Sequence, residues 1–224
     1  MKNSWPVVLM LLVSIYAVFF FILVRLANNP VIATLKPDSQ TFLLWRFTYV
    51  AQEYIPLFNL LLPALHLWYW YDTDVSEGLL AVTGGKYKHS WSLLLILLLE
   101  GALLLPGLIW GFLKGYNLIW GCLLILSQTA VLVAALYGLT ILLRSVIVPM
   151  LFAEAYCLYC VTIGNGLPGG LYLCLLQPFG PINTLEQTSG KSLIWLIFLT
   201  SGIVLIVLLG IWESRRRRRN KRIK

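Results

Sequence analysis

The stretch SLIWLIFLTSGIVLIVLLGIW, residues 192–212, runs directly into ESRRRRRNKR, residues 213–222. About 20 apolar residues in a row are enough for one α-helix to cross the hydrocarbon core of a bilayer. A run of Arg and Lys beside such a segment is typical of the cytoplasmic end of a membrane helix. This stretch therefore predicts a transmembrane helix followed by a basic cytoplasmic tail at residues 214–224.

Five more segments have the length and composition of membrane helices. We place them at residues 5–26, 42–71, 90–113, 117–143 and 145–165. Hydrophobic residues make up 59% of the chain and charged residues 12%, whereas ordinary soluble domains are about 25% charged. The sequence predicts an all-α membrane protein, in which residues 1–213 form a single domain of six transmembrane helices.

The distribution of Lys and Arg predicts the side of the membrane on which the chain ends lie. Six spans place both termini on the same side. With the termini inside, 12 of the 17 basic residues lie inside and four outside, while Arg46 lies within a span. Since positive loops favour the cytoplasmic side, we expect a multi-pass protein of the cell membrane with both termini in the cytoplasm.

The formal net charge of +8 comes almost entirely from the basic tail. Eight of the basic residues follow Trp212, and a basic segment beside a membrane helix is suited to contact anionic lipid. We therefore expect membrane lipid, and no nucleic acid, as the partner of the tail.

Two connections between the predicted spans are long. Residues 166–191 would lie outside, and their apolar piece 171–177 is too short to cross, so it lies in the interface or re-enters the bilayer. Residues 72–89 would face the cytoplasm, where Asp74 or Ser76 is suited to cap a short helix that Gly84 and Gly85 end. Such an amphipathic helix suits docking to a soluble partner; an ordinary interfacial loop is the alternative.

Four ionisable side chains stand out inside predicted spans, where charges are costly and often functional. They are Arg46, Glu53, Glu100 and Glu154. Arg46 and Glu53 are seven residues apart and so share one face of a helix. These residues are candidates for substrate or proton handling. The alternatives are pairing that holds the helices together and, for Arg46, extension of the side chain to the outer interface.

Motifs of catalysis and cofactor binding are absent from the sequence. It contains no HExxH, no GxSxG and no Walker A motif. Cys157 and Cys160 have CxxC spacing but lack a second pair or nearby histidines, so we interpret them as small apolar residues of a helix and expect no metal site. We expect no catalytic residue and no cofactor in this chain. An intramembrane enzyme that uses Glu100 and Glu154 is a minor alternative.

The layout resembles an ABC-2 type (type-2 exporter) ABC transporter permease over the whole chain. Six spans, both ends inside, a short cytoplasmic segment after the second span and a long outer segment before the last together carry this resemblance. In the cytoplasmic segment, Glu77-Gly78-Leu79-Leu80 followed by TGGKYK at residues 83–88 is similar to the family's order of acidic, apolar, turn and basic residues.

The resemblance implies the membrane subunit of an exporter, without ATPase activity of its own. Its partners would be a second permease, as homodimer or heterodimer, and a separate ATP-binding cassette subunit that holds ATP and Mg. In the family the cytoplasmic segment forms a coupling helix. The residues implied to dock the ATPase are Asp74, Glu77, Gly78, Leu79, Leu80 and Lys86. A non-transporting polytopic membrane protein, such as an assembly factor, an immunity protein or a receptor subunit, is the alternative.

Overall fold

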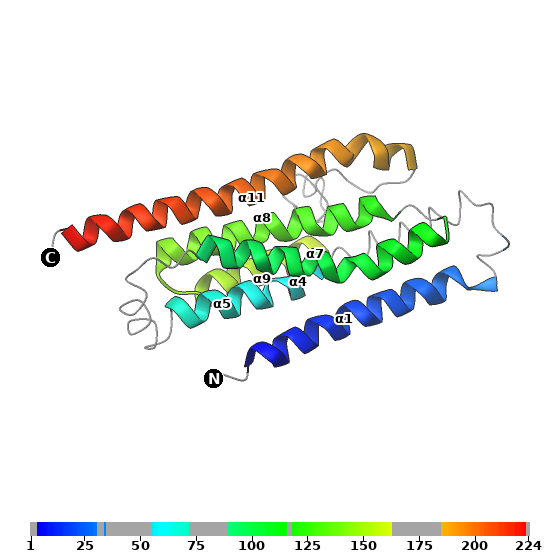
Figure 1. Cartoon of the computed structure of the whole chain (residues 1–224), viewed down its shortest axis with the longest axis horizontal. Helices are drawn as coiled ribbons and strands as arrows, with labels where there is room; N and C mark the ends of the chain where they lie inside the picture. Colours follow the sequence, from blue (N-terminus) through cyan, green and yellow to red (C-terminus); the bar gives the residue numbers. More distant parts are fainter. Residues whose placement is uncertain are drawn as a thin grey trace.

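The computed structural model describes residues 4–30, 34, 55–71, 89–115, 118–162 and 185–222. Every regular element in these residues is a helix, and the helices form an elongated bundle (Figure 1). They are α1 (Ser4–Ala27), α4 (Ile55–Asn59), α5 (Leu61–Tyr71), α7 (His89–Leu113), α8 (Ile119–Leu143), α9 (Ile147–Thr162) and α11 (Leu185–Arg222). For this part of the chain, the prediction of an all-α protein is confirmed.

Four helices are long and apolar enough to cross a membrane. Their candidate spans are Pro6–Arg25, His89–Leu113, Gly121–Leu143 and Leu196–Arg216. Large apolar side chains such as Leu98 and Phe112 are exposed on the outside of the bundle, which is stable in lipid and costly in water. These helices identify a membrane protein. The apolar part of α9, Ile147–Tyr156, is shorter, and residues 42–54 lie outside the described residues, so the count of six spans stays a prediction.

α8 is the central helix of the bundle. Its candidate span is 67% buried, against 17% for the first span and 22% for each of the other two. It packs against α11, α7, α9, α4 and α5, and Ala130, Val133 and Tyr137 are part of the largest buried apolar cluster. Because lipid tails are as apolar as the side chains, it is close packing that holds such helices together.

Glycines allow α11 to approach its neighbours closely. A Cβ atom on Gly202 would lie 2.8 Å from the carbonyl carbon of Ala130 in α8, so a larger residue does not fit there. A Cβ atom on Gly210 would lie 2.5 Å from Ser90 Oγ in α7. Small residues of this kind are typical of interfaces between membrane helices. The two contacts fix how α11 passes α8 and the start of α7.

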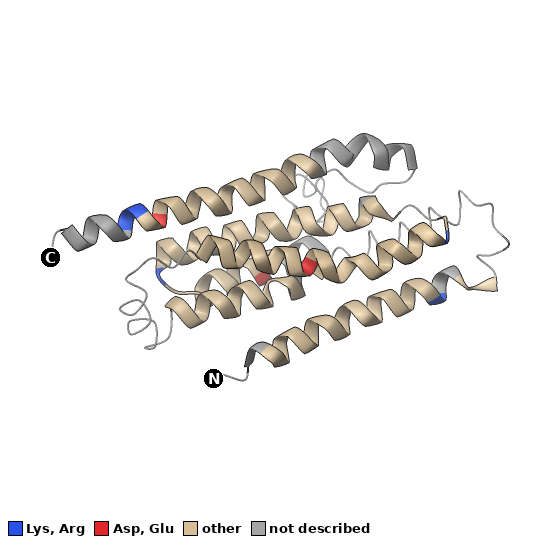
Figure 2. Cartoon of the chain, in the orientation of Figure 1, with Lys and Arg blue, Asp and Glu red and all other residues tan. Residues whose placement is uncertain are grey.

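α11 continues without a break from the last span into the basic tail. It begins at Leu185, before the predicted start at residue 192, and ends at Arg222. In Figure 1 it ends toward the left, where α1 and α7 begin and α5 ends. Figure 2 shows that the described Lys and Arg lie at or near helix ends. The middle of the bundle, as far as the structure describes it, therefore carries no basic residue.

Candidate functional site

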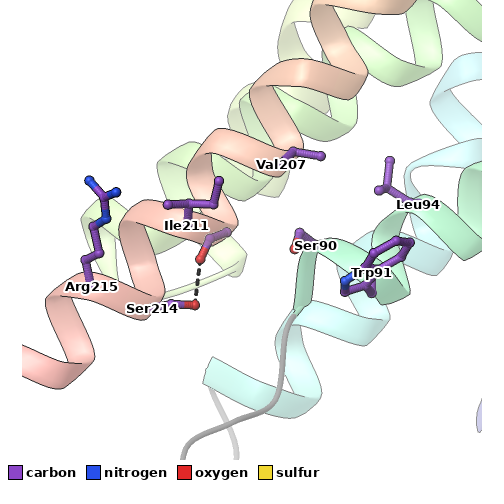
Figure 3. Close-up of a pocket in the computed structure, with 8 residues that line it drawn as sticks. Ser90, Trp91, Leu94, Val207, Ile211, Ser214 and Arg215 are labelled. Atoms are coloured by element: carbon purple, nitrogen blue, oxygen red, sulfur yellow. Dashed lines mark hydrogen bonds between the residues drawn. The ribbon is translucent and has the colours of Figure 1, made fainter.

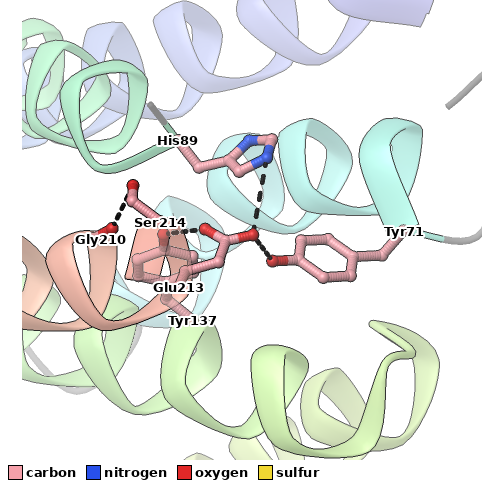
Figure 4. Close-up of polar contacts among 6 residues, drawn as sticks. All are labelled: Tyr71, His89, Tyr137, Gly210, Glu213 and Ser214. Atoms are coloured by element: carbon pink, nitrogen blue, oxygen red, sulfur yellow. Dashed lines mark hydrogen bonds and ion pairs between the residues drawn. The ribbon is translucent and has the colours of Figure 1, made fainter. Parts of the chain in front are cut away.

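Side chains from four helices meet at the carboxylate of Glu213 (Figure 4). The hydroxyl of Tyr71, the last residue of α5, donates a hydrogen bond to Oε1, and the hydroxyl of Tyr137 in α8 donates one to Oε2 at 2.6 Å. Nε2 of His89, the first residue of α7, lies 3.9 Å from Oε1. We call these four residues the Glu213 cluster; it joins α5, α7, α8 and α11.

Aromatic rings enclose His89 in this cluster. The ring centroids of Trp70 and Tyr71 lie 5.1 and 5.8 Å from that of His89, and the ring of His66 lies 5.8 Å away. His89 has no exposed surface, and Glu213 is 7% exposed. In such an enclosed place hydrogen bonds to a carboxylate are strong, and losing one of the partners is costly.

The position of Glu213 follows from the packing of α11. Gly210 and Glu213 are three residues apart and therefore share one face of the helix. Because Gly210 has no side chain, that face lies against Ser90 at the start of α7. The same close approach brings Glu213 next to His89.

A second polar network lies inside the bundle between α1, α4 and α8. The hydroxyl of Tyr16 donates to Asn59 Oδ1 at 3.0 Å, and Asn59 Nδ2 donates to Thr129 Oγ1 at 3.1 Å. Thr129 Oγ1 donates in turn to the backbone oxygen of Ile125 at 2.9 Å. All three side chains are buried. Hydrogen bonds of this kind connect helices in the membrane interior.

Glu100 of α7 belongs to neither of these hydrogen-bond networks. It has no exposed surface, and neither of its carboxyl oxygens has a hydrogen-bond partner in the described part of the chain. It is close enough to Tyr16 for the two groups to interact electrostatically. A buried polar group without a partner costs about 1–3 kcal/mol, so its presence calls for a reason other than stability.

The structure describes two of the predicted intramembrane residues, on different helices. Glu100 is fully buried in α7, whereas Glu154 in α9 is half-buried. Among the described contacts, no hydrogen bond or ion pair joins them. The other predicted site residues lie outside the described residues: Arg46, Glu53, Asp74, Glu77, Gly78, Leu79, Leu80 and Lys86. The same holds for the predicted cytoplasmic helix and for residues 166–184 of the outer segment.

Sequence reasoning missed the Glu213 cluster. Because the predicted third span begins at residue 90, the sequence places His89 in the cytoplasmic connection. In the structure His89 is instead the first residue of α7 and is fully buried. Glu213 stands at the predicted boundary between the domain and the tail. One signal was available, because Glu213 is the only acidic residue after Glu186 and directly precedes a run of arginines.

No group of three or more His, Cys, Asp or Glu side chains in the described residues is suited to hold a metal ion. Comparisons with protein-family models, with curated proteins and with solved structures gave no match. A functional assignment therefore depends on the residues and geometry of this chain.

Proposed function

We propose that this chain is the membrane-spanning permease subunit of an ABC exporter, with six transmembrane helices and both termini in the cytoplasm. It forms the translocation path with a second permease subunit, identical or related. ATP and Mg are bound by a separate ATP-binding cassette subunit, which docks on residues 72–88. The supporting observation is that Tyr71, which precedes the connection, donates a hydrogen bond to Glu213, and that His89, which follows it, lies 3.9 Å from the same carboxylate.

Residues 72–88 connect α5 to α7. Tyr71 directly precedes this connection and His89 directly follows it, and their ring centroids lie 5.8 Å apart. A force that a partner exerts on the connection therefore reaches α5 and α7 together. Through the hydrogen bond from Tyr137 to Glu213 it also reaches α8 and α11. Energetic coupling between sites travels through packed and hydrogen-bonded elements of this kind, and an ABC exporter needs such a connection at its ATPase.

The interior of the bundle supplies polar groups for a translocation path. Ionisable residues inside membrane spans mark substrate and ion pathways in many proteins. Glu100 has no hydrogen-bond partner in the described residues and lies near the network that begins at Tyr16. We assign contact with substrate or a transferred proton to Glu100, and we take Glu154 as the second candidate.

Purification of the tagged chain from its native membrane in a mild detergent tests the proposal. We expect a stoichiometric P-loop ATPase in the preparation and ATP hydrolysis by the complex. Recovery without an ATPase, under conditions in which a known ABC complex survives, contradicts the proposal. That result favours a non-transporting membrane protein, or an intramembrane enzyme if activity of the chain alone is lost in Glu100→Gln.

Charge reversal in the connection tests the docking element separately. Glu77→Arg combined with Lys86→Glu should reduce co-purification of the ATPase while membrane insertion is unchanged. Lys114→Glu is a control for charge reversal away from the connection, because Lys114 is exposed and follows the opposite end of α7. If both variants retain the ATPase equally well, residues 72–88 are not the docking element.

A further inference from the structure

A groove of about 430 Å³ opens between the start of α7 and the end of α11 (Figure 3). Its walls are largely apolar. Trp91 and Leu94 of α7 lie on one side, and Val207 and Ile211 of α11 lie on the other. α7 enters the bundle here while α11 leaves it, so the Leu94 and Val207 end is the deeper one.

The other end of the groove is polar. Ser90 and Arg215 lie there; Ser90 is more than nine-tenths buried, and Arg215 is exposed. Ser90 Oγ makes no hydrogen bond to the other lining residues, whereas the hydroxyl of Ser214 donates to the Gly210 oxygen at 2.8 Å (Figure 3). Within the described residues, no ion pair engages Arg215. Figure 3 shows the Arg215 side chain directed away from Ser90, so among the described lining residues the cation of this end is Arg215 alone.

The candidate spans indicate the depth of the groove in the membrane. The span of α7 begins at His89, and that of α11 ends at Arg216. On these bounds we place the end with Ser90 and Arg215 at the boundary between membrane and water, and the apolar end in the hydrocarbon. Trp91, which is 63% exposed, has the interfacial position typical of Trp in membrane proteins.

We propose that this groove binds one anionic phospholipid, with an acyl chain between Leu94 and Val207 and its phosphate group at Arg215. Charge complementarity determines the choice of occupant. Arg215 is followed in the same helix by residues 216–219, all of them Arg. Among the described residues no ion pair joins Glu213 to Arg215, so the Arg215 guanidinium is available to an external anion.

The headgroup must supply the selectivity. An acyl chain gains little on moving from the bilayer into an apolar groove, because the two environments are alike. The contact of a phosphate with a guanidinium differs between lipids of different charge, and one basic residue near a membrane surface changes association about fivefold. This inference does not depend on the proposed transport function.

Quenching of Trp91 by brominated lipid tests the proposal on the full chain. The chain is reconstituted in phosphatidylcholine vesicles that contain either brominated phosphatidylglycerol or brominated phosphatidylcholine at equal content. The contribution of Trp91 is the difference in fluorescence between the chain and its Trp91→Phe variant. We expect the anionic lipid to quench Trp91 more strongly, with a relative association about fivefold higher.

Neighbouring arginines provide a matched pair of variants. Arg215→Gln should abolish the preference for the anionic lipid at Trp91. Arg216→Gln removes the same charge from the next residue, which lies over the ring of Trp212 at 5.5 Å, and should retain the preference. Val207→Phe, which fills the apolar end and leaves the charges unchanged, should lower the preference as well.

Three results would overturn the proposal. Equal quenching of Trp91 by both lipids in the unchanged chain would show a groove open to any acyl chain. An equal effect of the two arginine substitutions would show general attraction to the surface. Absence of quenching by either lipid would show that protein, such as a second copy of this chain, covers the groove.

Discussion

Two buried carboxyl groups in this bundle have opposite surroundings. Glu213 accepts hydrogen bonds from Tyr71 and Tyr137 and lies beside His89. Glu100 is more deeply buried, and its oxygens have no hydrogen-bond partner in the described residues. A buried polar group stabilises a fold only when its hydrogen bonds are made. We infer that Glu213 joins helices, whereas Glu100 lowers stability and serves another purpose.

The largest effect is expected for Glu213→Ala. The substitution removes two hydrogen bonds to a charged group and leaves two tyrosine hydroxyls without their acceptor, so we expect a loss of about 3 kcal/mol in stability. Unfolding in detergent micelles with a rising fraction of SDS measures the change. Glu213→Gln, which keeps the shape and one acceptor oxygen, should lose less. Unchanged stability in the Ala variant would show that the cluster does not hold the helices together.

Glu100→Leu should change stability in the opposite direction. Replacing a buried carboxyl group that lacks partners with an apolar side chain of similar size should stabilise the bundle by about 2 kcal/mol. Transport, or ATP hydrolysis stimulated by substrate, should be lost at the same time. The same unfolding assay and an activity assay of the complex measure the two effects. Loss of the variant protein from membranes would instead assign Glu100 to packing.

A smaller effect is expected for Tyr137→Phe. It removes one hydrogen bond to the Glu213 carboxylate and should cost about 1.5 kcal/mol. In the Glu213→Ala background the same substitution should cost almost nothing, because the bond is already absent. The four unfolding curves of this double-mutant cycle measure the coupling. Additive effects would mean that the bond between Tyr137 and Glu213 contributes little.

Glu154→Leu should have the smallest effect, within about 0.5 kcal/mol, because a half-buried carboxyl group loses less of its contact with polar surroundings than a fully buried one. Comparing the unfolding midpoint of Glu154→Leu with that of Glu100→Leu shows how much the effect of removing a carboxyl group depends on its burial. A gain as large as that of Glu100→Leu would show that full burial does not distinguish the two sites.

The sequence predicts the long helices of the described residues well, because the length of an apolar run is a local property. It does not anticipate the division of the described part of the predicted span 42–71 into α4 (Ile55–Asn59) and α5 (Leu61–Tyr71). The predicted spans 90–113 and 117–143 agree with α7 (His89–Leu113) and α8 (Ile119–Leu143) within the usual uncertainty of helix ends. Glu100 could be identified from the sequence equally well, since a carboxyl group within an apolar run is recognisable without knowing its neighbours in space.

The Glu213 cluster could not be predicted in this way. Tyr71 and Glu213 are 142 positions apart, and Tyr137 and Glu213 are 76 apart. Their contact depends on how closely α11 passes α7 and α8, which the glycines at 202 and 210 permit. Local patterns carry no information on such pairings. For the same reason, the boundary predicted at residue 213 gave no indication that α11 continues to Arg222.

The continuous helix through the basic tail has a mechanical consequence. Successive residues of an α-helix are turned by about 100° and rise 1.5 Å, so the five arginines at 215–219 surround the helix axis within a height of about 6 Å. Basic positions distributed around the axis in this way give anionic lipid little hold on the rotation of the helix. Movement of the helix along its axis, in contrast, would pull charges away from the lipid headgroups. The tail therefore resists piston-like displacement of α11, while its rotation is restricted by the Glu213 cluster and by the close contacts at Gly202 and Gly210.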